Sequence, residues 1–540
     1  MSALPTGARP GLLGTLAHGV GSQHDLPISP FYAFAGAFTA LFVSFLALGL
    51  LWSTSRFRGD RSGVPLPGAL QRLADAPPFR AALRVLGAAA VLFLFVHLLF
   101  GPSDPERNAA PGAVYVLLWV GLVPASLLFG PVWRLVSPLR ALHFLLSRTV
   151  TWARTAAPPQ CDPGAAPHAP DPAVPDPVSS SPLPHSSHRP AGRNRAGDPE
   201  TPPKDPRGSL TEHQGGPPTH ASTGAPAHAP APTAAPAPAA VAATPTATHP
   251  KRTPAFASPR PLPARIGLWP AAVGLLAFTW LELVAPEPAA RTTLLCALAV
   301  HLLGQLALAA RYGEAWFAHG DPFEAYSTLL ARLAPLGRRA DGRLVLRNPL
   351  HGLDATPEQP GLVATLCVLL GSTAYDGISD HPDWIDTLQT SPLGRTATAT
   401  LGLLAITLLV GALYGLCAGA TRLLSGATAR PATAFAHSLL PIALGYLTAH
   451  YFSLLTTEGP RTLALLAGSA DATAPESPLG PGGLAVLQVT AVITGHVLGV
   501  VAAHDRSVRL FPPVRAVAGQ LPLLILMIIY TVGGLGLLLN

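Results

Sequence analysis

Four ionisable side chains occur near one end of apolar segments in this sequence: His97, Glu282, Asp376 and His450. Imidazole and carboxylate groups bind divalent metal ions and carry protons. Inside an apolar segment such groups are costly, so they are candidates for a functional site. Together the four predict a metal site, with zinc or copper as the expected ion. For each residue taken singly, an ordinary structural role stays open.

Three further candidates precede the first apolar segment, in the stretch TLAHGVGSQHDLPISP: His18, His24 and Asp25. As an external loop they would cover the mouth of the same site. Cleavage after Ala17 would instead make His18 the amino terminus, and its amine and imidazole could chelate copper. However, the preceding residues contain two prolines and almost no apolar core, so they make a poor signal peptide. We favour a plain linker.

A second polar set lies toward the opposite ends of the apolar segments: His437, His504 and Asp505. The two histidines match in depth, as a pair of haem ligands would. Nothing else in the sequence supports a haem pocket. We therefore predict an inner polar cluster to which no chemistry is assigned.

The elements that position these residues are predicted to be transmembrane helices. The chain has 540 residues, of which 49% are hydrophobic and 12% charged, whereas soluble domains carry about 25% charged residues. The apolar residues gather into blocks that match the roughly 20 residues needed to cross a bilayer as a helix. We predict an all-α polytopic bundle of about ten spans: 31–52, 81–101, 112–131, 266–285, 292–310, 361–376, 396–419, 433–455, 484–504 and 517–539.

Arginine residues orient this bundle. Five arginines lie between residues 56 and 80, four between 134 and 154, and six between 311 and 347, whereas the alternate loops are acidic or nearly neutral. Because basic loops stay in the cytoplasm, both termini are predicted to face outward. The formal charge of +7 is thereby explained by membrane topology, and we expect a lipid bilayer as partner and no nucleic acid.

The chain divides into four predicted regions. They are an extracytoplasmic segment (1–30), a three-helix membrane part (31–154), a disordered cytoplasmic linker rich in Pro and Ala (155–262), and a seven-helix membrane part (263–540) with a cytoplasmic loop (311–360). The linker sequence PAHAPAPTAAPAPAAVAATPTATHP cannot bury a core.

Two interfacial helices are predicted next to the spans. One covers residues 138–149. The other begins in the cytoplasmic loop, where Asp321 can cap the helix, Pro322 suits its first position and Glu324 completes a capping box. We expect this second helix to lie under the bundle, with its arginines at lipid headgroups.

Several stretches resemble a set of actinobacterial multi-pass membrane proteins that are commonly labelled fenitrothion hydrolase. They include AHGVGSQHDLPI, VYVLLWVGLVPASLLFGPVWRLVSPLR, FTWLELVAPE, GRRADGRLVLRNPL, LLGSTAYDG, HSLLPIALGYLTAHYFSLL and GHVLGVVAAHDRSVRLF. The resemblance covers both membrane parts and skips the linker. It implies a bacterial plasma-membrane protein that hydrolyses an organophosphorus ester, and it carries over no catalytic residues.

Two functions remain open on this basis. In the first, a divalent metal held by His450, Asp376, Glu282 and His97 lowers the pKa of bound water, and the resulting hydroxide attacks phosphorus. The sequence lacks a Walker loop, HExxH, CxxC and nucleophile elbow, so no compact motif supports this chemistry. In the second, the protein is a non-enzymatic permease or a metal-handling or assembly protein.

Overall fold

The computed structural model describes residues 30–156, 260–426, 430–469 and 471–539. Within these ranges, nine helical segments are long and apolar enough to cross a membrane. A tenth apolar helix, α9 (Trp269–Leu283), is shorter, with 15 residues. Every predicted span therefore forms a helix, and the prediction of an all-α polytopic membrane bundle is confirmed. Residues 1–29 and 157–259, which include most of the predicted linker, lie outside the described ranges.

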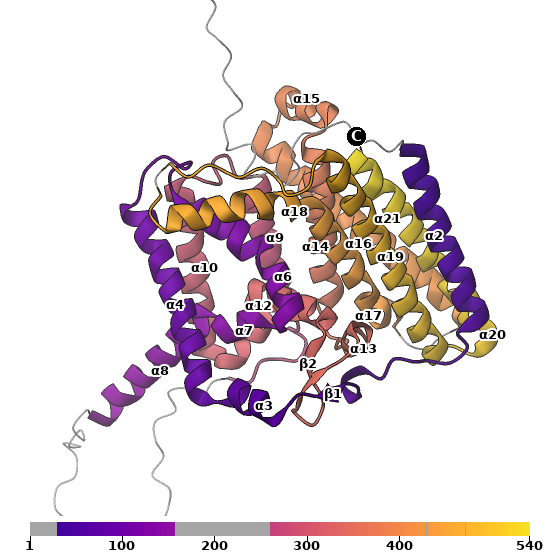
Figure 1. The fold of residues 1–540 in the computed structure, drawn as a ribbon, viewed down its shortest axis with the longest axis horizontal. Helices are drawn as coiled ribbons and strands as arrows, with labels where there is room; N and C mark the ends of the chain where they lie inside the picture. Colours follow the sequence, from indigo (N-terminus) through magenta and orange to yellow (C-terminus); the bar gives the residue numbers. More distant parts are fainter. Residues whose placement is uncertain (1–29, 157–259, 427–429, 470, 540) are drawn as a thin grey trace, which may run out of the picture. The chain divides into compact units, whose positions relative to one another are not determined.

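The remaining long helices follow the predicted order along the chain. They are α2 (Pro30–Leu51), α4 (Pro77–Phe100), α10 (Arg291–Tyr312), α14 (Leu362–Ser379), α16 (Arg395–Ser425), α18 (Leu439–Leu466), α19 (Pro481–Leu510) and α21 (Leu521–Leu539). Shorter helices connect or flank them: α3 (Gly68–Asp75), α7 (Val132–Val136), α8 (Pro138–Ala156), α11 (Phe317–Gly320), α13 (Pro349–Asp354), α15 (Pro382–Thr390), α17 (Pro431–Phe435) and α20 (Pro513–Ala516). In Figure 1, one part of the bundle consists of α14, α16, α18, α19 and α21, which pack on one another, and α2 lies beside α19.

The third span changes its helical type halfway. It consists of α5 (Ala109–Gly112), a π-helix η2 (Ala113–Val120) and α6 (Leu122–Phe129). At its end the amide of Gly121 donates to the carbonyl of Val116, five residues back, at 2.8 Å. Short π-helical turns are rare and occur often at functional sites. This one carries Tyr115 and Trp119, both buried, into the interior of the bundle.

Helices α18 and α19 pack closely because glycines face each other. A methyl group at Gly445 would lie 2.6 Å from the carbonyl oxygen of Ala491, and one at Gly495 would lie 2.5 Å from that of Pro441. Only glycine allows such close approach of two helix backbones. The contact fixes the position of α18, which carries His450.

A small antiparallel sheet lies at the arginine-rich end of the bundle. Its strands are β1 (Val64–Pro65), β3 (Leu344–Leu346) and β2 (Leu336–Arg338), in that order. Strand β3 is central, so it joins the loop after the first span to the loop after α10. This sheet is absent from the sequence-based expectations, because strands of two or three residues are too short to show an alternating pattern.

Helix α12 (Pro322–Leu330) begins where predicted but is not interfacial. Asp321 accepts a hydrogen bond from the amide of Phe323 at 3.0 Å and so caps the helix. Eight of its nine residues are buried, against α6, α7 and α9. Glu324 does not complete a capping box, because its carboxylate instead receives two hydrogen bonds of 2.7 Å from Arg140 of α8. This buried ion pair allows the helix to lie inside the protein rather than at lipid headgroups.

Candidate functional site

Asp376 and His450 form a buried pair between two spans. Asp376 lies one turn before the end of α14, and His450 lies near the middle of α18. His450 Nε2 is 2.5 Å from Asp376 Oδ2, and the Tyr451 hydroxyl donates to the same oxygen at 3.1 Å. Exposure is 2% for Asp376 and 4% for His450. A carboxylate in this position fixes the orientation of the imidazole ring.

Glu282 of α9 lies in the same interior region. Its side chain is 3% exposed, and its Oε2 atom has no hydrogen-bond partner among the described residues. It lies within electrostatic reach of Asp376 and of the Tyr451 hydroxyl. The structure thus brings together three of the four residues singled out as the main site: Glu282, Asp376 and His450.

The fourth residue, His97, lies apart from this group. It is half-buried on α4, where its Nδ1 atom lies 3.2 Å from the carbonyl of Phe93 and its ring lies 4.2 Å from the Phe93 ring. Helix α4 packs mainly against α7, α8 and α10. The three weaker candidates, His18, His24 and Asp25, are outside the described residues.

The donor set does not fit the divalent metal that we expected. Among the described residues, no three His, Cys, Asp or Glu side chains are grouped closely enough to hold a metal ion. Asp376 Oδ2 is already shared between His450 and Tyr451. Structural and catalytic zinc sites need at least three protein ligands. We therefore derive no chemical step through a metal.

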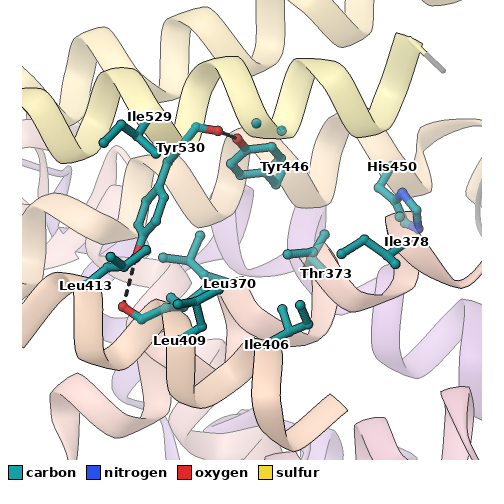
Figure 2. Close-up of a pocket in the computed structure, with 15 residues that line it drawn as sticks. Leu370, Thr373, Ile378, Ile406, Leu409, Leu413, Tyr446, His450, Ile529 and Tyr530 are labelled. Atoms are coloured by element: carbon teal, nitrogen blue, oxygen red, sulfur yellow. Dashed lines mark hydrogen bonds between the residues drawn. The ribbon is translucent and has the colours of Figure 1, made fainter. Parts of the chain in front are cut away.

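An apolar cavity adjoins the pair. It has a volume of about 340 Å³ and is lined by residues of α14, α16, α18 and α21. Figure 2 shows His450 at one end, near Thr373 and Ile378, with Leu413 and Tyr530 toward the other. No sequence pattern predicted this cavity, because aliphatic residues that line a cavity have the same character as those that face lipid.

The other polar groups in the cavity wall are hydrogen-bonded to backbone carbonyls. The Tyr446 hydroxyl donates to Tyr530 at 2.5 Å, and the Tyr530 hydroxyl donates to Val410 at 2.8 Å. The Thr373 hydroxyl donates to its own helix at 2.8 Å. Among the described residues of this wall, His450 differs because its polar contact is with a carboxylate and not with a backbone carbonyl.

The predicted inner set forms a different kind of site. Asp505 of α19 accepts hydrogen bonds from the Trp52 indole (3.1 Å), the Ser55 hydroxyl (2.7 Å) and the Arg56 amide (2.5 Å). His504 contacts the Gln520 side chain at 3.2 Å and the Trp52 carbonyl at 3.0 Å. These contacts tie the end of α19 to the chain that follows α2. We interpret them as structural.

An ion-pair group extends this inner region and faces His437. Arg506 donates to Asp354 Oδ1 at 3.1 Å, and Arg509 also bonds to this carboxylate. Burial raises the pKa of Asp354, but the hydrogen bond and charge of Arg509, together with Arg506, hold it below its ordinary value. His437 contacts the Ala434 carbonyl at 3.0 Å.

Comparison with known proteins adds no assignment. No family model, no curated protein and no solved structure matches the chain. The resemblance noted from the sequence therefore stays a prediction. The fold establishes a multi-pass integral membrane protein with an apolar cavity beside a buried histidine–carboxylate pair.

Proposed function

We propose that the protein binds a lipophilic molecule in the apolar cavity and that His450 acts on it as a general base. One observation carries the proposal: His450 lines the cavity and is also hydrogen-bonded to a buried carboxylate. Cavity walls Leu409 and Ile529 are each 52% exposed at the outside of the bundle. A ligand dissolved in the bilayer therefore reaches the cavity from its side. We place the protein in a bacterial plasma membrane, following the family resemblance.

The favoured reaction is hydrolysis of a lipophilic ester. With Nε2–H donating to Asp376, the lone pair of His450 is on Nδ1, where it accepts a proton from water. The water oxygen forms a bond to the ester phosphorus or carbon while the bond to the leaving oxygen breaks. The protonated imidazole, stabilised by Asp376, returns its proton to the leaving group. General-base catalysis of this kind contributes about 10²–10⁴-fold to the rate.

The cavity also limits the class of substrate. Because Thr373, Tyr446 and Tyr530 use their hydroxyls on backbone carbonyls, the wall offers few polar groups to a ligand besides His450. A molecule with an apolar body and a single reactive polar group suits this arrangement. The resemblance to proteins labelled fenitrothion hydrolase makes an organophosphorus triester the first substrate to test.

A turnover assay in nanodiscs with a chromogenic phosphotriester tests this proposal. We expect His450→Ala and Asp376→Asn to lower kcat by about 10²-fold or more. His97→Ala is the matched control, and it should retain full turnover, as should wild type treated with a chelator. Full turnover by His450→Ala would remove the proposed base. Loss in His97→Ala and on chelation would instead support the four-ligand metal site.

The second candidate is a non-enzymatic permease. It is supported by Glu282, which adds a second carboxylate to Asp376 and His450 in the interior, as in proton-linked carriers. The assay that separates the two functions follows the probe itself. A permease moves a lipophilic probe across proteoliposome membranes and leaves it chemically intact, whereas the hydrolase releases its alcohol or phenol. A metal-handling or assembly role lacks a comparable observation.

A further inference from the structure

A group of buried polar atoms around Asp376 has no hydrogen-bond partner among the described residues. The atoms are Trp119 Nε1, which lies near the Tyr451 hydroxyl, Glu282 Oε2, the Tyr326 hydroxyl and Asp376 Oδ1. All four side chains are 3% exposed or less. Leaving one such atom without a partner costs about 1–3 kcal/mol. Four of them in one region need a physical explanation.

These side chains are neighbours, although they come from four elements. The rings of Trp119 and Tyr326 stack with centroids 4.6 Å apart. The Trp119 ring also lies 5.0 Å from Phe278, one turn before Glu282 on α9. Glu282 lies within electrostatic reach of both Tyr326 and Asp376. We call this group, Trp119, Glu282, Tyr326 and Asp376, the polar chamber.

Donors and acceptors in the polar chamber are complementary. Trp119 supplies an N–H donor, Tyr326 supplies a hydroxyl, and the two carboxylates supply acceptor oxygens. A water molecule accepts from the indole and donates to a carboxylate, and buried waters typically make two to four such bonds. A metal cation would leave the Trp119 N–H unsatisfied. Water is therefore the ligand that fits this set.

We propose that ordered water fills the polar chamber and connects Glu282 to Asp376 by hydrogen bonds. The water would link the Asp376–His450 pair to a second carboxylate, so that a proton can pass between them. The π-helix η2 explains how Trp119 reaches this position, because its wider turn occurs at the residues that face the chamber. The proposal is independent of any ligand or reaction in the apolar cavity.

Hydroxyl-radical footprinting by X-ray radiolysis tests the proposal on the full-length protein in detergent. Radicals form from the bound water itself, so buried side chains are oxidised only where water lies next to them. We expect Trp119 and Tyr326 to be oxidised several-fold faster than Tyr414. Tyr414 is the internal control, because it is 1% exposed and its hydroxyl donates to the Ala432 carbonyl at 2.7 Å.

Oxidation of Trp119 and Tyr326 no faster than Tyr414 would overturn the proposal and would indicate a dry contact, with a shared proton between the two carboxylates. In Glu282→Leu we expect the Tyr326 rate to fall to that of Tyr414. A rise in the Tyr414 rate would identify a misfolded variant, and the wild-type comparison remains decisive in that case. Because no ligand or turnover is measured, failure here is distinct from failure of the proposed function.

Discussion

Two buried polar regions of this protein contain similar residue types but differ in how completely their polar atoms are hydrogen-bonded. In the anchor region (His504, Asp505), both ring nitrogens and both carboxylate oxygens have partners from neighbouring elements. In the cavity region (Glu282, Asp376, His450), one oxygen of each carboxylate has no hydrogen-bond partner among the described residues, and His450 lines the apolar cavity. Saturated polar groups stabilise a fold, whereas unsatisfied ones are retained where function requires them.

The buried Arg140–Glu324 pair belongs to the saturated class and gives the largest expected effect. Arg140→Met leaves the buried Glu324 with only the exposed Arg134, 3.9 Å away, as a cationic neighbour, so we expect the free energy of unfolding in detergent to fall by about 3 kcal/mol. Arg140→Met combined with Glu324→Leu removes both charges and should recover most of that loss. A double variant as unstable as the single one would show that packing, not charge, dominates there.

Asp505→Ala should have the next largest effect. It removes the acceptor for the Trp52 indole, the Ser55 hydroxyl and the Arg56 amide, which lowers the free energy of unfolding by about 3 kcal/mol. Thermal unfolding followed by tryptophan fluorescence measures the change. If the variant unfolds at the wild-type temperature, the anchor region is not structural and the contrast between the regions is lost.

Asp321 tests whether hydrogen bonds alone are enough to keep a buried carboxylate from destabilising the folded state. Burial raises its pKa from 3.8 to about 7, against the opposing effect of the Trp133 indole N–H. At a pH between these two pKa values, Asp321 is more often protonated in the folded state than in the unfolded state. Stability should therefore fall as pH rises from about 4 to about 7, by up to about 1.4 kcal/mol per pH unit, and then level off.

The measurement for Asp321 is the difference in unfolding free energy between wild type and Asp321→Asn across this pH range. The neutral variant should lack the decline, so the difference should grow with pH. A constant difference would mean that Asp321 does not titrate in this window.

Glu282→Gln should have the smallest effect on stability. The substitution replaces a buried carboxyl group whose Oε2 atom has no hydrogen-bond partner among the described residues. We expect the free energy of unfolding to stay unchanged or to rise by up to about 1 kcal/mol. Glu324→Gln is the matched control, because the same chemical change weakens a saturated ion pair and should destabilise. Equal losses of unfolding free energy in both variants would contradict the distinction between saturated and unsatisfied polar groups.

Sequence patterns predicted the spans well but not their neighbours. Each apolar block is long enough to identify a helix by itself. Depth along a helix, however, does not specify which face meets which helix. His97 has a depth similar to that of His450, yet α4 packs elsewhere. Tyr451, which donates to Asp376, was missed because its aromatic ring is unremarkable within an apolar span.

Other features depend on contacts between distant parts of the chain. Burial of α12 follows from Arg140, which lies 184 residues before Glu324. The polar chamber depends on a π-helix, and a uniformly apolar stretch gives no sign of a change in helical type. Such features follow from tertiary packing, which periodicity in a single sequence does not report.

A matched pair of histidine substitutions tests the central distinction most directly. His450→Leu and His504→Leu are compared for the temperature of unfolding and for binding of a fluorescent lipophilic probe that carries one polar group. We predict that folded His450→Leu loses probe binding, whereas folded His504→Leu binds the probe normally although it unfolds at a lower temperature than the wild type. Wild-type probe binding by folded His450→Leu, or its loss in folded His504→Leu, would contradict the account.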